Sequence, residues 1–327
     1  MWTKLACLLP LTFLSALASP TQSPRPLVIW HGLGDSHSSP GMVEFQDLIK
    51  EVHPGIFIHS VRIEEALDKD REAGFYGNVN SQLELVADEL SSIPELEDGF
   101  DAIGFSQGGQ FLRAYVERYN YPPTYNLITF GSQHLGIADI PECGTYDFLC
   151  KSARRIVLGA VYGHWAQENL IQAQYFRDPT RYAEYLTANH FLADINNEVH
   201  GQRNATYKEN LQTLENLVLI IFSEDKTVVP KESAWFGYEE ITDDDSAALV
   251  DDLTGQEQRP LVASSSSSSS EQTIVPMRQQ PIYTEDWIGL KELDESGRIV
   301  FGVCDGEHMH LGDCWKDYVK KYVGSLV

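Results

Sequence analysis

The chain has 327 residues, of which 43% are hydrophobic, so it can bury a substantial core in one large domain or two smaller ones. Its formal net charge of −24 argues against nucleic acid as a partner, because phosphates would repel so acidic a surface. Composition does not decide the oligomeric state.

Residues 1–18 have the pattern of a signal peptide. Lys4 precedes an apolar stretch over 5–17, and Ala16-Leu17-Ala18 is a small-residue cleavage site. The stretch is too short for a convincing membrane span, and no later segment reaches ~20 apolar residues. We therefore expect a mature domain over 19–327 without a transmembrane segment. Its destination is the lysosome, the vacuole or the outside of the cell.

Strand and helix patterns alternate from residue 26 to residue 130, which predicts an α/β fold with a mostly parallel central sheet. In chain order, the expected elements are a strand at 26–30, helices at 42–52 and 80–91, a strand at 100–103, a helix at 107–119 and a strand at 126–130. In the helix at 107–119, Arg113 and Glu117 are spaced i,i+4 and are expected on the face opposite the apolar side chains.

The first of these strands ends in His31-Gly32-Leu33-Gly34-Asp35. This loop is similar to the His-Gly loop of lipases and esterases, which offers a backbone N–H to a developing oxyanion. We assign the two oxyanion donors to the amides of Leu33 and Gln107. No helix with G-x-G-x-x-G spacing follows, so a dinucleotide site is not expected.

The strand at 100–103 leads into Gly104-Phe105-Ser106-Gln107-Gly108, which fits the G-x-S-x-G nucleophile elbow. In that turn a serine is exposed in a strained conformation between a strand and a helix. The glycines are needed because the two backbones approach too closely for a Cβ. The expected strand before Ser106 and the expected helix after it supply this context.

More than eighty residues separate the strand at 126–130 from the next one at 217–222, far more than a normal connection. Aromatic and aliphatic helical segments fill the interval, so we expect a helical cap subdomain over about 135–212. Within it, Val157, Val161 and Trp165 recur at i,i+4. This stripe either packs against the main domain or lines an apolar groove.

A nucleophilic serine needs a base and an orienting acid on loops after late strands, in the order serine, acid, histidine. Asp225 follows the strand at 217–222, with Glu224 as its competitor. His308 follows a strand at 298–303, with His310 as its competitor. Between acid and base, about 241–272 is acidic and serine-rich, which predicts a disordered surface insertion.

Six runs of the sequence are distinctive together, at 30–35, 104–113, 191–196, 235–237, 283–286 and 289–292. In these runs the chain resembles the palmitoyl-protein thioesterases, a family of lysosomal enzymes. The similarity extends from about residue 26 to the C-terminus, apart from 241–272. The resemblance implies an α/β-hydrolase fold, Ser106 as nucleophile, Asp225 as acid and His308 as base. The sequence departs from the family pattern at Ser36-His37-Ser38, where related animal enzymes carry cysteines.

The resemblance also bears on the cysteines. Removal of the signal peptide leaves an even four, which would pair in an oxidising lumen. A disulfide between Cys143 and Cys150 agrees with the family pattern. Of the four cysteines, Cys304 and Cys314 then remain as the second pair. No C-x-x-C spacing exists, and His308-Met309-His310 has no partner cluster, so we expect neither a metal nor a cofactor. Asn204 is the acceptor in Asn204-Ala205-Thr206 for N-glycosylation.

The sequence thus indicates a serine hydrolase acting through an acyl-enzyme. The triad permits thioester cleavage without selecting it, and only the resemblance favours S-acylated proteins or peptides with long acyl chains as substrates. Two alternatives stay open: a secreted lipase or carboxylesterase acting on oxygen esters, and a non-catalytic hydrolase-like binding protein.

Overall fold

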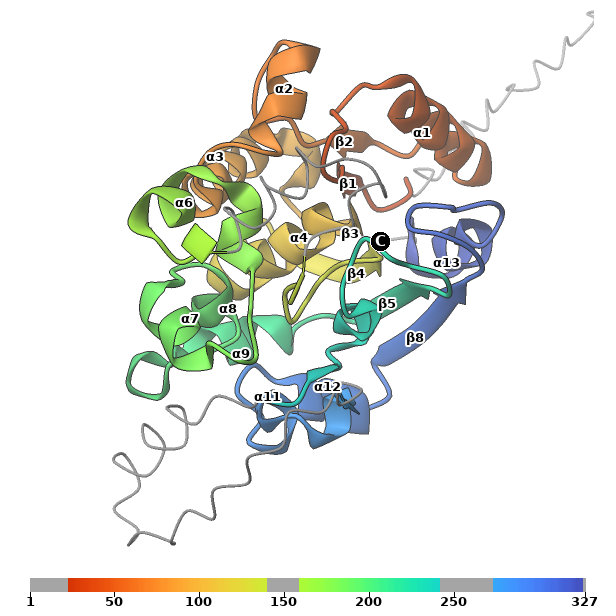
Figure 1. The fold of residues 1–327 in the computed structure, drawn as a ribbon. Coiled ribbons are helices and arrows are strands. Elements are labelled where there is room, and N and C mark those ends of the chain that lie inside the picture. The colour runs from red at the N-terminus through yellow and green to blue at the C-terminus, as the bar shows by residue number, and fades with distance from the viewer. Residues whose placement is uncertain (1–22, 140–158, 242–272, 326–327) are drawn as a thin grey trace, which may run out of the picture.

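The computed structural model describes residues 23–139, 159–241 and 273–325 (Figure 1). The predicted signal peptide, the Cys143–Cys150 pair, Val157 and nearly all of the predicted insertion at 241–272 lie outside the described residues. No helix in the described ranges is long and apolar enough to cross a membrane.

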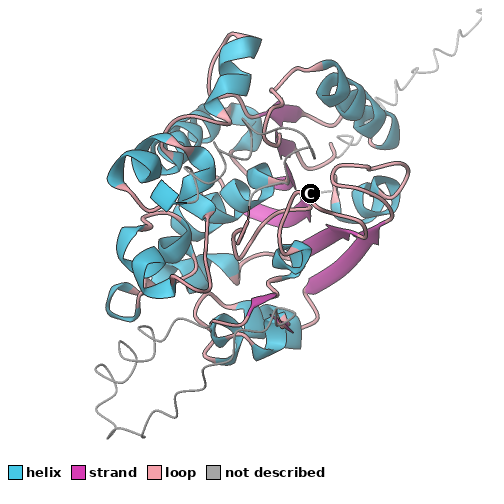
Figure 2. Ribbon diagram, viewed as in Figure 1, coloured by secondary structure: helices cyan, strands magenta, loops and turns pink. Residues whose placement is uncertain are grey.

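A six-stranded sheet in the order β2-β1-β3-β4-β5-β8 forms the centre of the molecule, and every neighbouring pair in it is parallel (Figure 2). Its strands are β1 (Leu27–Trp30), β2 (Ile58–Ser60), β3 (Phe100–Phe105), β4 (Thr124–Phe130), β5 (Asn216–Phe222) and β8 (Ile299–Cys304). A separate antiparallel pair consists of β6 (Tyr238–Glu239) and β7 (Ile274–Val275).

Helices cover both faces of this sheet (Figure 1). The α-helices are α1 (Pro40–Val52), α2 (Leu67–Ala73), α3 (Val79–Ser92), α4 (Gln107–Arg118), α6 (His164–Asn169), α7 (Tyr182–Ala188), α8 (Leu192–Ile195), α9 (Ala205–Leu211), α11 (Pro281–Thr284), α12 (Leu290–Glu295) and α13 (Trp315–Tyr322). Short 3-10 helices lie at Pro94–Leu96, Ile171–Tyr175, His200–Gln202, Lys231–Trp235 and Met277–Gln279.

The strands alternate their side chains between two cores, because successive residues of a strand point to opposite faces. On one face, Val28 and Trp30 of β1 pack in a cluster with α3, α4 and the helices that follow β4. On the other face, Leu27 and Ile29 pack in a second cluster with α1 and α13. Burial on both faces explains why β5 is apolar almost throughout. The predicted α/β-hydrolase architecture is confirmed.

The predicted helix starts differ from the observed ones where local capping extends a helix. In α1, Pro40 occupies the first turn and the Ser39 hydroxyl accepts a hydrogen bond from the amide of Met42, so the helix begins two residues before the predicted start. The Asn78 side chain caps α3 in the same way. Among the elements that were not predicted are β2 and α2, which are short, and α13, whose sequence was not interpreted.

The expectation for Arg113 and Glu117 was wrong. Both side chains are completely buried, and Arg113 Nη1 donates to Glu117 Oε1 at 2.8 Å. Helix α4 is buried on all sides over Gln107–Glu117, because α3, α8 and α9 pack against it as well as the sheet. The pair is satisfied further by Asn196, whose Oδ1 accepts from Arg113 Nη2 at 2.8 Å. A charged i,i+4 pair therefore did not mark a solvent-exposed face here.

The segment between β4 and β5 contributes α6 to α9 on the side of the sheet where α4 lies (Figure 1). A buried ion pair between Arg177 and Glu198 stands at its centre, with 3.0 Å between Arg177 Nη2 and Glu198 Oε2. The hydroxyls of Tyr182 and Tyr185 donate to the same carboxylate at 2.8 and 2.9 Å. These polar contacts fix the helices to one another.

Burial of Glu117 predicts how stability depends on pH. Complete burial raises the pKa of Glu117 from 4.5 to about 7, although Arg113 opposes the shift. As pH rises, the folded protein keeps the proton of Glu117 up to about pH 7, whereas the unfolded chain has already released it. The stabilisation that this proton gives the folded state is present at acid pH and is lost as pH rises through about 7. We expect the free energy of unfolding, measured with urea, to be higher at pH 5 than at pH 8 by about 2 kcal/mol.

The variant Glu117→Gln isolates this group from the general self-repulsion of an acidic chain, because its side chain cannot ionise. The difference in unfolding free energy between pH 5 and pH 8 should shrink in the variant. An equal difference in both proteins would contradict the assignment to Glu117.

Candidate active site

Ser106 occupies the turn between β3 and α4. Its backbone has φ 51° and ψ −123°, a strained conformation for a residue with a side chain. The turn is held by the Ser106 amide, which donates to the carbonyl of Phe130 in β4 at 2.8 Å. The serine is thereby fixed at the carboxyl end of the sheet, the edge where open α/β sheets bind ligands.

The glycines around this serine are required by close backbone approach. A Cβ on Gly104 would lie 2.2 Å from the Cα of Gly109, and one on Gly108 would lie 2.3 Å from the carbonyl oxygen of Trp30. Real Cβ atoms do not approach so closely. The strand, the helix and the end of β1 can meet at Ser106 only because these positions lack side chains.

His308 and Asp225 converge on this serine from two other loops. His308 Nε2 lies 3.1 Å from Ser106 Oγ, and His308 Nδ1 lies 2.6 Å from Asp225 Oδ2. A carboxylate can only accept, so Nδ1 carries hydrogen and Nε2 faces the serine hydroxyl as an acceptor in the neutral ring. Nucleophile, base and orienting acid thus stand in one hydrogen-bonded line.

Asp225 is held by its own loop, whereas its competitor is not. Its Oδ1 accepts from the amides of Thr227 and Val228 at 2.8 and 3.0 Å, which orients the carboxylate toward His308. Glu224 is exposed, as is His310, the competitor for the base. The structure therefore brings Asp225 and His308, rather than their neighbours, to Ser106.

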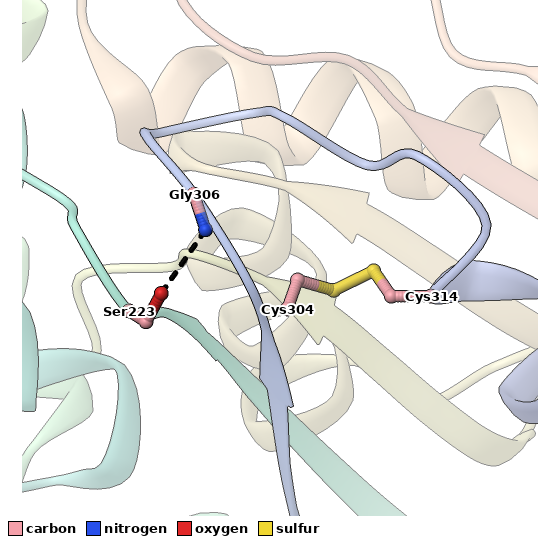
Figure 3. Close-up of a disulfide and its surroundings, with 4 residues drawn as sticks. All are labelled: Ser223, Cys304, Gly306 and Cys314. Atoms are coloured by element: carbon pink, nitrogen blue, oxygen red, sulfur yellow. Dashed lines mark hydrogen bonds between the residues drawn. A yellow bond between two sulfur atoms is a disulfide. The ribbon is translucent and has the colours of Figure 1, made fainter.

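The loop that carries His308 is fixed at both ends (Figure 3). A disulfide joins Cys304 at the end of β8 to Cys314 before α13, ten residues apart. Inside this loop the amide of Gly306 donates to Ser223 Oγ at 3.0 Å, which ties it to the strand end before Asp225 (Figure 3). Acid and base are thus held to each other as well as to the sheet.

The predicted oxyanion donors border the same serine. A Cβ on Gly32 would lie 3.3 Å from the Cβ of Ser106, so the loop after β1 touches the turn directly. Neither the Leu33 amide nor the Gln107 amide donates a hydrogen bond within the described ranges. The side chain of Gln107 is held by Tyr175, whose hydroxyl donates to Gln107 Oε1 at 3.1 Å.

A buried carboxylate lies behind the loop after β1. Asp70 of α2 is fully buried and sits 2.9 Å from His37 Nδ1 and 3.4 Å from His31 Nε2. Burial opposes ionisation, but the neighbouring His31 and hydrogen bonds from His37 and the amide of Ile63 hold the pKa of Asp70 well below its usual range. The sequence did not single this residue out.

A cavity of about 440 Å³ opens beside Ser106 and His308. That size suits a small or mid-sized organic ligand. Most of its walls are apolar, and its other lining residues are Gly32, Leu33, Asp35, Gly41, Met42, Phe45, Phe105, Gln133, Ile137, Gln172, Tyr175, Thr227, Val228, Met309 and Leu311.

Two of the three predicted groove residues, Val161 and Trp165, do not line this cavity. Val161 is buried in the core at 2% exposure, Trp165 is 64% exposed on α6, and Val157 lies outside the described residues. The i,i+4 spacing failed because α6 begins only at His164, so Val161 and Trp165 do not share a helix face. The cavity draws instead on residues after parallel strands, such as Gln133 after β4, a position that the rule for open α/β sheets could have flagged.

The glycosylation acceptor predicted at Asn204 is exposed at the start of α9, and its side chain accepts from the amide of Thr206 at 3.0 Å. Its exposure leaves the position accessible.

Comparisons with known proteins agree on one family. The sequence model for "Palmitoyl protein thioesterase" matches residues 26–308. The chain is 39% identical to "Palmitoyl-protein thioesterase 1" of Caenorhabditis elegans over 97% of both chains. It is 35% identical to "Palmitoyl-protein thioesterase 3" of Dictyostelium discoideum over 94% of this chain and 91% of that protein. It is 27% identical to "Lysosomal thioesterase PPT2" of Homo sapiens over 89% and 84%.

Solved structures resemble the chain more remotely. RedJ, the thioesterase from the prodiginine biosynthetic pathway in Streptomyces coelicolor, matches with a TM-score of 0.41 and 14% identity over 94% of this chain and 93% of that one. The hydrolase BphD from Rhodococcus sp. strain RHA1 also has a TM-score of 0.41, with 12% identity over 91% and 88%.

The disulfide generates a prediction for stability and rate. The double variant Cys304→Ser/Cys314→Ser frees a short loop in the unfolded chain, which should lower the free energy of unfolding by about 2–3 kcal/mol. Because His308 lies inside that loop, kcat should fall several-fold while KM changes little. Urea unfolding and steady-state kinetics measure the two effects. An unchanged free energy of unfolding would mean that the disulfide does not stabilise the fold.

Proposed function

The chain belongs to the palmitoyl protein thioesterase family, and from that premise we propose that it hydrolyses the thioester between a long-chain acyl group and a cysteine of a protein or peptide. We assign the chemistry to Ser106 as nucleophile, His308 as base and Asp225 as orienting acid. The observation that carries this assignment is the hydrogen-bonded line from Ser106 Oγ through His308 to Asp225 Oδ2.

The reaction proceeds through an acyl-enzyme. His308 Nε2 takes the proton of Ser106 as its oxygen attacks the thioester carbonyl, and the amides of Leu33 and Gln107 stabilise the negative oxygen. The carbon–sulfur bond breaks and the thiol leaves. The leaving sulfur takes the proton from His308 Nε2, which makes His308 neutral again. Water then gives a proton to His308 as it attacks the acyl ester, and that proton passes to Ser106 Oγ as the fatty acid is released.

A thiol is an undemanding leaving group. A cysteine thiol has an ordinary pKa of ~8.5, so its sulfur departs with little protonation, unlike an alkoxide or an amine. An oxygen ester would need His308 to deliver the proton at the right moment. The triad therefore permits thioester cleavage, and it is the family of the chain that favours thioesters over oxygen esters as substrates.

We place the acyl chain in the cavity beside Ser106. Its apolar wall includes Met42, Phe45, Ile137 and Leu311. Each buried CH₂ contributes ~0.8 kcal/mol, so a chain of palmitate length gains much of its affinity there. Gln172 and Tyr175 reach this cavity from the segment between β4 and β5, which supports its role as a cap over about 135–212.

An acidic compartment suits this protein. The relatives include a protein named as a lysosomal thioesterase, and the chain carries a formal net charge of −24. Protonation of some carboxylates at acid pH would relieve that self-repulsion. We propose delivery by the N-terminal signal peptide to the lysosome or vacuole, with a glycan on Asn204.

Substitutions at the three assigned residues test the mechanism. Ser106→Ala, His308→Ala and Asp225→Ala should each reduce kcat for a palmitoyl thioester peptide by about 10³-fold or more, and combined changes should not add. Matched controls are Ser91→Ala, His310→Ala and Glu224→Ala, each at an exposed position of the same residue type or charge. Full activity of His308→Ala beside an inactive His310→Ala would overturn the choice of base.

Parallel kinetics on an oxygen ester test the substrate class. We expect kcat/KM for a palmitoyl thioester to exceed that for the matching palmitoyl oxygen ester by about 10-fold or more, because of the leaving group. Equal or faster turnover of the oxygen ester would identify a lipase or carboxylesterase.

A further inference from the structure

Four hydrogen-bond donors surround the Asp70 carboxylate. Its Oδ1 accepts from the amides of Ile63 and Glu64 at 2.7 and 3.2 Å. Its Oδ2 accepts from both the amide and the Nδ1 atom of His37 at 2.9 Å. These donors fix the carboxylate directly behind the loop that follows β1.

His31 links this carboxylate to that loop. Its ring is 3% exposed, and its Nε2 lies 3.4 Å from Asp70 Oδ2, within ion-pair distance though not aligned as a hydrogen bond. On its other side, His31 Nδ1 lies 3.1 Å from the carbonyl oxygen of Gly32. A carbonyl oxygen can only accept, so Nδ1 is the donor. The Asp70 carboxylate attracts Nε2 on the far side of the ring when that nitrogen also carries a hydrogen, as it does in the imidazolium form.

The carbonyl of Gly32 and the amide of Leu33 belong to the same planar trans peptide, so they point in opposite directions. The Gly32 oxygen is held by His31 and by the amide of Asp35 at 3.3 Å. The Leu33 N–H must then point the other way, and Leu33 lines the cavity beside Ser106. A hydrogen-bonded carbonyl also polarises its peptide and strengthens the N–H as a donor.

We propose that Asp70 is a positioning residue for the oxyanion hole, acting through His31 on the Gly32–Leu33 peptide. This inference rests on the proposed function, because Leu33 is an oxyanion donor only if Ser106 attacks an acyl carbonyl. Asp70 touches no substrate. It holds the His31 ring in place, the ring holds the peptide, and the peptide directs the amide.

His37 provides the matched control. It contacts the same carboxylate oxygen as His31 and at a shorter distance, but it makes no hydrogen bond with Gly32, which is also among the described residues. A purely structural role for Asp70 would make both histidines matter alike. A positioning role makes only His31 matter for the rate.

The test uses Asp70→Asn, His31→Leu, His31→Asn and His37→Ala in the full chain, with a palmitoyl thioester peptide as substrate. Misplacing one oxyanion donor should lower kcat by about 10- to 100-fold in Asp70→Asn and His31→Leu, with KM within about 2-fold of wild type. His31→Asn keeps a short amide donor for the Gly32 carbonyl, so it should retain more activity than His31→Leu. His37→Ala should stay within about 3-fold.

Two inhibitors separate the oxyanion hole from the rest of the site. A long-chain trifluoromethyl ketone forms a tetrahedral adduct with the serine and places an oxyanion in the hole. An S-hexadecyl cysteine peptide, a thioether, fills the cavity without one. The ketone should bind more weakly to Asp70→Asn and His31→Leu by the factor lost in kcat, whereas thioether binding should be unchanged.

The proposal is overturned if ketone and thioether affinities fall together, or if His37→Ala loses as much kcat as His31→Leu. If Asp70→Asn does not fold, His31→Leu against His31→Asn decides alone. Wild-type turnover and its loss in Ser106→Ala are measured first. If they fail, it is the proposed function that is wrong.

Discussion

The site depends on the close approach of three backbones at the turn around Ser106. The end of β1, the end of β3 and the first turn of α4 meet there so tightly that Gly104 and Gly108 have no room for a Cβ. This contact sets the strained conformation of the serine. It also puts the loop after β1 against the turn that carries Ser106. The other parts of the site are arranged around this contact between the three backbones.

Two buried carboxylates, those of Asp225 and Asp70, each lie beside a histidine of the site. Asp225 holds His308 toward the serine, and Asp70 lies 3.4 Å from the His31 ring in the loop after β1. Each carboxylate is itself fixed by backbone amides, so neither histidine depends on a mobile acid. The low dielectric constant of the protein interior strengthens such arrangements, because interactions with a charged group become stronger when water is excluded. In both the proposed mechanism and the proposed positioning role, a buried carboxylate fixed by backbone amides orients a histidine.

Much of this arrangement could be predicted from sequence, because its signals are local. Parallel strands, the serine turn and the order of Ser106, Asp225 and His308 follow from short motifs placed at strand ends. Most of the apolar cavity wall was not predicted, because it is assembled from loops far apart in the chain. Arg113 and Glu117 were misplaced for a similar reason: helices from a distant segment cover a face that i,i+4 spacing alone marks as exposed.

The central claim is that Ser106 carries the acyl group during turnover, and mass spectrometry of the trapped intermediate tests it most directly. The enzyme is mixed with excess palmitoyl thioester peptide, quenched in acid within the first turnovers and digested. We expect one palmitoyl group in ester linkage on the peptide that contains Ser106. A palmitoyl group found on another residue, with Ser106 unmodified under conditions of active turnover, would contradict the account.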